Sequence, residues 1–501
     1  MNQWNPLIDE EWTHPASSQG AQRIISFRLE SDVLLLRFRV EFTIIAYSDD
    51  NADSSFILYA NHPDIQAAQK QMLKNEFSAV LHKIKKNSPS VLFFDPKKNF
   101  RGRWDASFSD WKTISAKKAS DGFAAGPVAA GEWKAQILVP ALGGASLRAH
   151  LQVESSAEDE ESSVSAMVYQ WPDHEPQAGD ERWYIGELHE HTSNSNGALS
   201  PEATADLYKS LDYQFLALTD HDFRPLATFG KTPPLELIRG QEIRTFFGHA
   251  LLLGIKDYLR WRSENEPFDL DVLIYETHRL GGLFCALHPF AMSADGKSDS
   301  WQGAEASWSR IDLLEIWPGR WRQRFPEILK ALDLWDSLLN RGLRIYGVCG
   351  KGSGVPMNER SVETLPKTAV FSEGPNETEL LGALKQGRFY STREPGVSFW
   401  AYSNHGGAMM GDELRLPAGE PYQLVLDVSL MEKRGFVRIK SNEGIYCEMP
   451  LSSTKDSHLE FIEFSKTEVR WFRAEVYQYG RPLDELAALT NPIFVRGVMS
   501  A

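Results

Sequence analysis

Short runs of alternating hydrophobic and polar residues dominate the first 155 positions of the chain. Residues 33–40 alternate toward their end, 91–96 form an apolar run that ends in Asp-Pro, and 131–140 and 147–153 continue the pattern. Side chains alternate between the two faces of a strand, so these runs predict strands with one buried face. Gly, Pro, Asn and Asp separate them, as is typical of a β-sandwich. Residues 65–84 interrupt the series with a helix-like pattern.

The pattern changes at about residue 183, where short apolar strands begin to alternate with helical segments. The predicted strands lie at 215–218, 250–255, 283–287, 311–316 and 343–348. A helix is predicted over 200–211, because Ser200 is a good N-cap and Pro201 suits the first turn. Strands that alternate with helices form parallel sheets, and this many strands favour a (β/α) barrel.

Strand-like alternation returns after about residue 395, at 422–428, 435–439 and 469–476. A stretch rich in Glu, Asp and Ser also separates the first β region from the β/α region, and we interpret it as a solvated linker. We therefore predict four parts: an N-terminal β-sandwich-like domain (1–155), an acidic linker (156–182), a β/α barrel (183–394) and a C-terminal β domain (395–501).

Composition narrows the class of protein. A chain of 501 residues is too long for one ordinary core, so we expect about two to four domains. The formal net charge of −15 disfavours non-specific nucleic-acid binding, which needs concentrated Lys and Arg. We find no apolar run long enough for a spanning helix and no signal-peptide pattern, so we expect no membrane association. Three cysteines are few, and Cys285 and Cys349 lie in predicted strands, which favours buried thiols and a cytoplasmic location.

Histidines and acids gather where two predicted strands end. Glu187, His189 and His191 alternate along one apolar strand and should point the same way. A second apolar strand ends in Asp220 and His221. Exposed or packed histidines would explain one such strand end. Two of them favour a site for a metal ion, because two imidazoles and a carboxylate on one face form a typical ligand set.

Three later residues extend the same arrangement. Glu242 ends a strand, His249 begins the next one, and His288 follows the strand at 283–287. Taken singly, Glu242 could be a salt-bridged acid, and the two histidines could lie in a turn and a loop. Their joint occurrence at strand ends favours the metal site, because (β/α) barrels carry their functional residues at strand C-termini.

These motifs resemble those of a known family. The matching segments are Gly-Glu-Leu-His-Glu-His-Thr (186–192), Leu-Thr-Asp-His (218–221), Gly-Gln-Glu-Ile (240–243), Gly-His (248–249), Leu-His-Pro (287–289), Leu-Glu-Ile-Trp (314–317) and Thr-Asn-Pro-Ile-Phe-Val (490–495). Residues 184 to about 395 resemble the PHP (polymerase and histidinol phosphatase) superfamily, and most of all its CehA/McbA-type metallohydrolases. The resemblance implies an α/β fold, a distorted (β/α)7 barrel with up to three metal ions, here flanked by all-β, sandwich-like domains.

The resemblance also implies which residues bind the metals. One site would use His189, His191 and a bridging Glu242. A second site would use Glu242 with His249 and His288. A third would combine His221 with the position that Asn196 occupies in this chain.

The chain departs from the family pattern at two motifs. Asn196 stands where the family usually has Asp. The last motif resembles Gly-Ser-Asp-x-His in the family, but here Gly352 and Gly354 replace both metal-binding side chains. Glu242 is then the one clear carboxylate ligand, and unbalanced positive charge is costly in a closed site. We therefore expect one or two divalent ions (Zn, Mn or Fe) and an empty third site. Lys351 is predicted either to contact a substrate oxyanion or to face solvent from a loop.

Three functions are consistent with these features. The first is a metal-dependent hydrolase, phosphoesterase-like by family analogy, that acts on a small phosphorylated or anionic substrate. The second is a catalytically degenerate relative that binds a phosphate- or sugar-like ligand. The third is an interaction scaffold that uses the flanking β domains, with Trp104, Trp111 and Trp133 as binding platforms. For these tryptophans we favour core packing instead.

Overall fold

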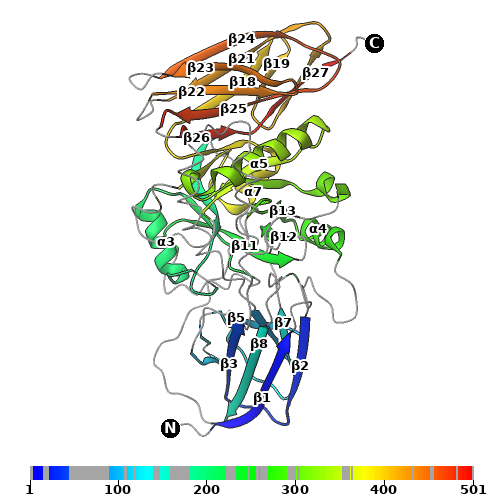
Figure 1. Ribbon diagram of the computed structural model, residues 1–501, viewed down its shortest axis with the longest axis vertical. Helices are drawn as coiled ribbons and strands as arrows, with labels where there is room; N and C mark the ends of the chain where they lie inside the picture. The colour runs from blue at the N-terminus through cyan, green and yellow to red at the C-terminus, as the bar shows by residue number, and fades with distance from the viewer. Residues whose placement is uncertain are drawn as a thin grey trace.

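The computed structural model is elongated, with the N-terminal strands at one end and the C-terminal strands at the other (Figure 1). It describes residues 4–14, 22–44, 90–105, 110–117, 119–120, 122–138, 147–157, 181–195, 197–221, 233–245, 248–255, 259, 269–291, 301, 305–351, 362, 365–429, 434–451, 456–480 and 483–498. The helix predicted over 65–84 and nearly all of the acidic linker lie outside these residues. In the described part, no helix is both long and apolar enough to cross a membrane.

Two antiparallel four-stranded sheets form the N-terminal end. The first sheet has the strand order β1 (Asn5–His14), β8 (Leu147–Ser156), β3 (Leu35–Ile44) and β6 (Lys112–Ser115). The second sheet has the order β2 (Gln22–Leu29), β7 (Gly131–Leu138), β4 (Ser90–Phe94) and β5 (Phe100–Asp105). Inward-facing side chains of both sheets share one hydrophobic cluster. Trp104 and Trp133 are fully buried in it, which confirms the prediction of core packing for these two. Trp111 is half-buried beneath the guanidinium of Arg37.

A row of seven neighbouring strands forms the middle of the molecule. Its strands are β9 (Arg182–Glu190), β10 (Phe215–Leu218), β11 (Glu236–Thr245), β12 (Gly248–Leu253), β13 (Leu283–Ala286), β14 (Leu313–Pro318) and β15 (Tyr346–Gly350). The helices described are α3 (Pro201–Ser210), α4 (Leu270–Arg279), α5 (Trp321–Asn340) and α7 (Glu377–Gln386), with one 3-10 helix, η1 (Glu305–Arg310). Helix α3 begins as predicted, with the Ser200 side chain accepting from the N–H of Ala203 and Pro201 in the first turn.

The expectation of a fully parallel central sheet is wrong at β12. Strands β9, β10 and β11 are parallel, and so are β13, β14 and β15, but β12 is antiparallel to both of its neighbours. Only two residues separate β11 from β12, and so short a connection joins antiparallel strands rather than a crossover. With this reversal and four α-helices in the described residues, a (β/α)7 barrel is not shown.

The two ends of the seven-strand row nevertheless approach each other. The backbone N–H of Lys351, which follows β15, donates to the Glu187 carboxyl of β9 over 3.2 Å. The buried side-chain amide of Asn491 lies beside β15. It accepts from the backbone N–H of Gly347 in β15 (2.8 Å) and donates to the carbonyl of Phe389 (2.9 Å). A C-terminal residue thereby fixes the strand that leads to Lys351.

The sheet continues without a break into the C-terminal strands. Beyond β9 it runs through β16 (Lys367–Ser372), β17 (Phe389–Thr392), β26 (Glu485–Thr490), β25 (Arg470–Gln478), β22 (Gly435–Ser441) and β23 (Gly444–Leu451), with β27 (Ile493–Val498) and β20 (Glu413–Pro417) at its side. A second sheet of β19 (Gly406–Met409), β18 (Val397–Ser403), β21 (Pro421–Val428) and β24 (Ser457–Phe464) packs on it around a shared core. The division into four domains stays a prediction.

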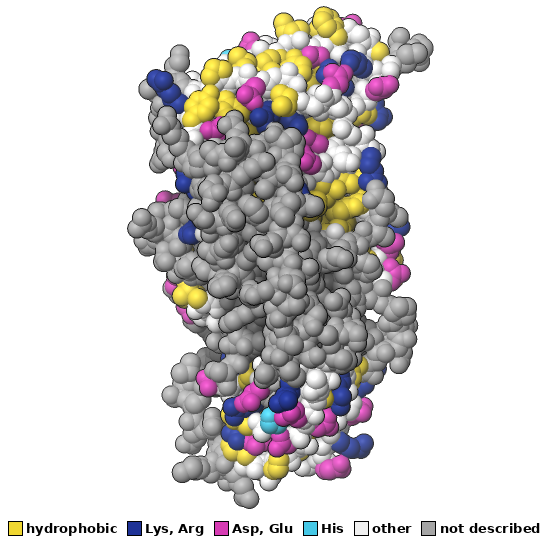
Figure 2. Space-filling view, viewed as in Figure 1, with side chains coloured by type: hydrophobic (Ala, Val, Ile, Leu, Met, Phe, Trp, Pro, Cys, Tyr) yellow, Lys and Arg dark blue, Asp and Glu magenta, His cyan; other side chains and the backbone are white. Residues whose placement is uncertain are grey.

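Hydrophobic side chains also gather on the surface of the C-terminal strands, at the top of Figure 2. Strand β24 lies at the edge of its sheet, and its Ile462 and Phe464 are among the exposed large hydrophobic residues. No described segment of the chain covers these two side chains, and the scaffold function stays a prediction.

Candidate metal centre

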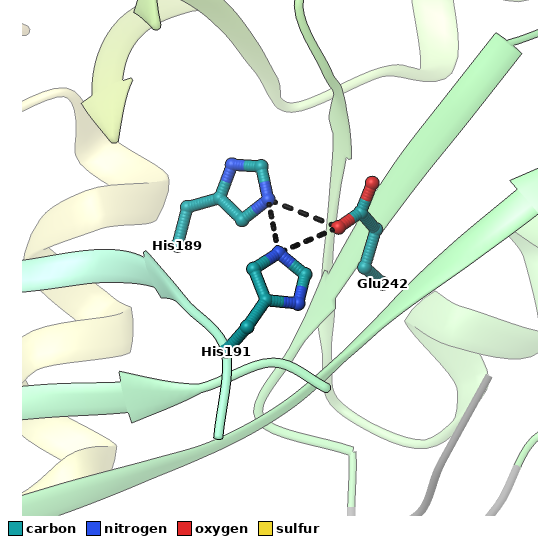
Figure 3. A group of neighbouring side chains, drawn as sticks. All are labelled: His189, His191 and Glu242. Carbon is teal, nitrogen blue, oxygen red and sulfur yellow. Dashed lines mark hydrogen bonds and ion pairs between the residues drawn. The ribbon is translucent and has the colours of Figure 1, made fainter. Parts of the chain in front are cut away.

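Two histidines, His189 in β9 and His191 just after it, converge on one carboxylate. His189 and His191 are two residues apart and point the same way, as strand alternation predicts, and both are buried. Their Nε2 atoms lie 3.2 Å apart, and each is 3.0 Å from Oε2 of Glu242 on β11 (Figure 3).

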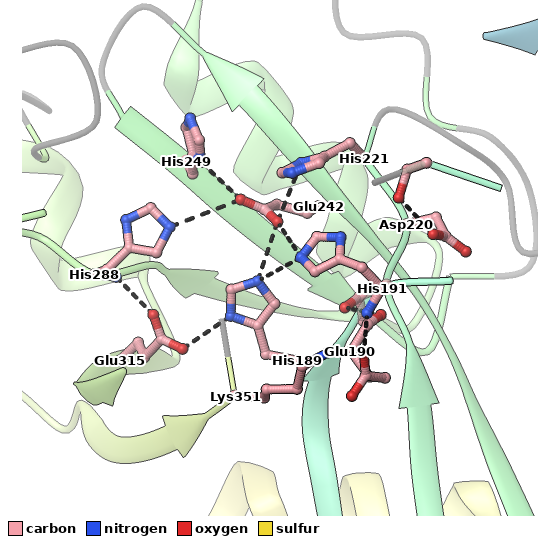
Figure 4. Close-up of polar contacts among 12 residues, drawn as sticks. His189, Glu190, His191, Asp220, His221, Glu242, His249, His288, Glu315 and Lys351 are labelled. Atoms are coloured by element: carbon pink, nitrogen blue, oxygen red, sulfur yellow. Dashed lines mark hydrogen bonds and ion pairs between the residues drawn. The ribbon is translucent and has the colours of Figure 1, made fainter. Parts of the chain in front are cut away.

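The other three predicted histidines surround the same carboxylate (Figure 4). Nδ1 of His221 lies 3.2 Å from Oε2 of Glu242, Nδ1 of His249 lies 2.7 Å from Oε1, and Nε2 of His288 lies 3.7 Å from Oε1. The structure therefore brings together all six residues that the sequence singled out, with the buried Glu242 at the centre. Their role as ligands stays a prediction.

The donor geometry fits a metal ion. Two groups of side chains could each hold one: His189, His191 and Glu242, and Glu242, His249 and His288. Ligands about 2.1 Å from a tetrahedral ion are about 3.4 Å from one another. The separations of 3.0, 3.0 and 3.2 Å in the first group come close to that value. Imidazole nitrogens and a carboxylate oxygen suit Zn, Mn and Fe.

Charge is concentrated around this group. Burial alone would raise the pKa of Glu242, but His221 and His189 bring it well below its usual range. Burial likewise opposes the charged form of His189, yet Glu315 and Glu242 raise its pKa well above normal. Burial lowers the pKa of His191. These opposing shifts show that the two buried carboxylates favour the charged form of His189, whereas a metal ligand must offer an unprotonated nitrogen, so metal binding at Nε2 would depend on pH.

Glu315 lies beside the centre; its motif matched the family pattern, but it was not among the predicted metal ligands. This fully buried residue of β14 accepts from Nδ1 of His189 over 2.9 Å and from the backbone N–H of His288 over 2.9 Å. A carboxylate behind a histidine fixes its ring and leaves the other nitrogen free to bind a metal. The available signal was an acidic residue inside the apolar strand Leu-Glu-Ile.

Backbone strain accompanies this contact at His288. Its φ is 24°, in the left-handed region that residues other than glycine rarely adopt. Such strain persists only where the surroundings impose it, and it is found at functional sites. Here the N–H bond to Glu315 holds the residue in place.

Asp220 supports the centre from behind. Its carboxylate accepts from the N–H (2.8 Å) and hydroxyl (2.6 Å) of Thr192 and from the hydroxyl of Ser195 (2.5 Å). These bonds fix the residue that precedes His221. Asn196 lies outside the described residues, as do Gly352 and Gly354.

The alternative of a solvent-facing Lys351 is wrong. Only 4% of the residue is exposed, and its Nζ lies 2.5 Å from Oε1 of Glu190. A contact with a substrate oxyanion stays a prediction. Glu187, expected to face the metal with the histidines, instead accepts from the backbone N–H groups of His189 and Lys351, and burial raises its pKa to about 8.

Comparisons with known proteins give distant likenesses. The chain matches no family model and no curated protein. Among solved structures, a two-domain protein containing a predicted PHP-like metal-dependent phosphoesterase from Bacteroides vulgatus is 14% identical, with 65% of this chain and 100% of that chain covered and a TM-score of 0.37. An amidohydrolase from Chromobacterium violaceum, with bound sulfate and no metal, is 14% identical, with 34% and 88% covered and a TM-score of 0.24. Likenesses this weak support neither a fold nor an activity for this chain.

Proposed function

We propose that this chain is a metal-dependent hydrolase of the PHP type that acts on a small phosphorylated or anionic substrate. The observation that carries the proposal is the convergence of five histidines on the buried Glu242 at near-ligand spacing. The motif resemblance suggests phosphoesters as the substrate class, with a central fold related to the (β/α)7 barrel of the CehA/McbA branch.

In this proposal, some residues of the centre would bind the metal ions and others position those ligands. His189, His191 and Glu242 would hold one divalent ion, and Glu242, His249 and His288 a second. A bound ion would polarise a phosphoryl oxygen and lower the pKa of a water molecule. Glu315 orients the ring of His189, and Asp220 orders the loop that carries Thr192 and Ser195. Burial of these groups strengthens their electrostatic interactions by excluding bulk water.

The first test of this proposal is metal content. Protein purified without chelator should contain about one or two equivalents of Zn, Mn or Fe by elemental analysis, because the donors form two groups. Chelation should remove both the metal and any hydrolysis of a phosphoester panel, and adding back the metal should restore hydrolysis. Protein that stays metal-free after loading would rule the hydrolase out.

A second candidate is a binding protein that has lost catalysis. Gly352 and Gly354 replace two family ligands, and the Lys351 ammonium is paired with Glu190 rather than free for a substrate. Such a protein would bind metal and inorganic phosphate, or a sugar-like ligand, with no turnover of any phosphoester. The experiment above separates the two, since both candidates predict bound metal and only the hydrolase predicts turnover.

Replacing Glu315 by Gln should weaken metal binding without abolishing it. The amide cannot accept equally well from Nδ1 of His189, so the ring is less firmly oriented, and such outer-shell changes cost about 10- to 100-fold in affinity. Titration with Zn²⁺ measures the change. Glu327→Gln, in a buried carboxylate of α5 that pairs with Arg324, is a matched control and should leave Zn²⁺ affinity unchanged. Equal affinity for Glu315→Gln and wild type would show that Glu315 does not support the centre.

A further inference from the structure

Glu190, the last residue of β9, lies between His189 and His191 in sequence but takes no part in the group around Glu242. Strand alternation turns its side chain to the other side of β9, where it is completely buried. Its Oε1 accepts from the backbone N–H of His191 over 2.8 Å, and its Oε2 accepts from the hydroxyl of Tyr208 over 2.5 Å. Glu190 therefore holds the backbone of a candidate ligand from behind.

Lys351 supplies the cation for this carboxylate. It follows the last residue of β15, and its Nζ lies 2.5 Å from Oε1 of Glu190 (Figure 4). Its backbone N–H is bonded to Glu187, so the residue is anchored at both ends. Burial, and then Glu190, raises the pKa of Tyr208 well above normal, so this hydroxyl stays protonated and donates to Glu190.

An unpaired carboxylate at this position would be unfavourable. Burying a charge without a partner costs far more than burying a paired one. Without Lys351, Glu190 would have to rotate away from His191 or attract another cation. Each of these outcomes disturbs the backbone that sets the 3.2 Å spacing of the two histidines.

We propose that Lys351 is a positioning residue of the metal centre: its ammonium pairs with Glu190 and keeps this carboxylate in the position from which it orders the backbone of His191. The inference rests on the proposed metal centre and goes beyond it. In this inference the partner of the Lys351 ammonium is Glu190, whereas the sequence suggested a substrate oxyanion.

Binding of Co²⁺ alone to the full chain tests this role, because the visible spectrum of bound Co²⁺ reports the ligand geometry independently of turnover. Lys351→Met should weaken Co²⁺ binding by about 10- to 100-fold and change the spectrum. The double variant Lys351→Met with Glu190→Gln removes both charges together and should recover wild-type affinity and spectrum. Lys385→Met, at an exposed lysine of α7, is the matched control and should behave as wild type.

The outcomes separate this inference from the proposed function. Wild type that does not bind Co²⁺ overturns the metal centre itself. Wild type that binds, with Lys351→Met identical in affinity and spectrum, overturns the positioning role alone. A double variant as impaired as the single one also overturns it, because the ammonium would then act on something other than Glu190. If Lys351→Met does not fold, the double variant decides: wild-type binding supports the inference, and loss of binding contradicts it.

Discussion

Replacing Glu242 by Gln should abolish binding at both metal sites. Glu242 belongs to both candidate groups of ligands. Ring nitrogens of five histidines surround its carboxylate. The amide is nearly the same size but carries no charge, so the loss should exceed the 10- to 100-fold effect of an outer-shell change. Calorimetric titration of the metal-free variant with Zn²⁺ should show that neither candidate site binds an ion.

Two single-histidine variants make this result specific. His191→Gln removes a donor of the first group only, and His288→Gln removes a donor of the second group only. Each should keep one equivalent of Zn²⁺ where wild type binds two. Circular dichroism of the metal-free proteins checks that all three variants fold. Full stoichiometry in Glu242→Gln would mean that the metal, if present, binds elsewhere in the chain.

The sequence predicted which residues lie together around Glu242 better than it predicted the fold that carries them. His189, His191, His221 and His288 could be placed because each lies at or just beyond the end of an apolar strand, and neighbouring strand ends meet at one edge of a sheet. The strand pattern carries no direction, however. The antiparallel β12 follows from the length of the β11–β12 connection, which the alternation of strands and helices does not reveal.

Side-chain contacts between distant parts of the chain could not be predicted from the sequence. Nothing in the local pattern of Glu190 says that its partners are Lys351, far along the chain, and Tyr208 on a helix. Lys351 was singled out for its place in a motif, and only the three-dimensional arrangement shows that its charge is already satisfied. Glu315 was visible as an acid in an apolar strand, but its partner His189 was not.

Adding one methyl group at Gly350 should disrupt the centre nearly as much as removing a ligand. Gly350 ends β15, and a Cβ there would lie 2.6 Å from Cβ of His189 and 2.6 Å from Oε1 of Glu315. Neither neighbour can easily move, since both are buried and bonded to each other. Gly350→Ala should therefore displace the His189–Glu315 pair, weaken Zn²⁺ binding by at least about 10-fold and lower the melting temperature, as overpacking in a core does.

Gly382 provides the control for this substitution because the same methyl group is added there at a position with room for it. It lies within helix α7, and a Cβ there would meet nothing within 4 Å. Alanine is favoured over glycine inside a helix by about 0.5–1 kcal/mol, so Gly382→Ala should stabilise the protein slightly and leave Zn²⁺ binding unchanged. Thermal unfolding and Zn²⁺ titration of both variants measure the contrast. If Gly350→Ala bound Zn²⁺ as tightly as Gly382→Ala, the close approach of β15 to His189 would not control the metal centre.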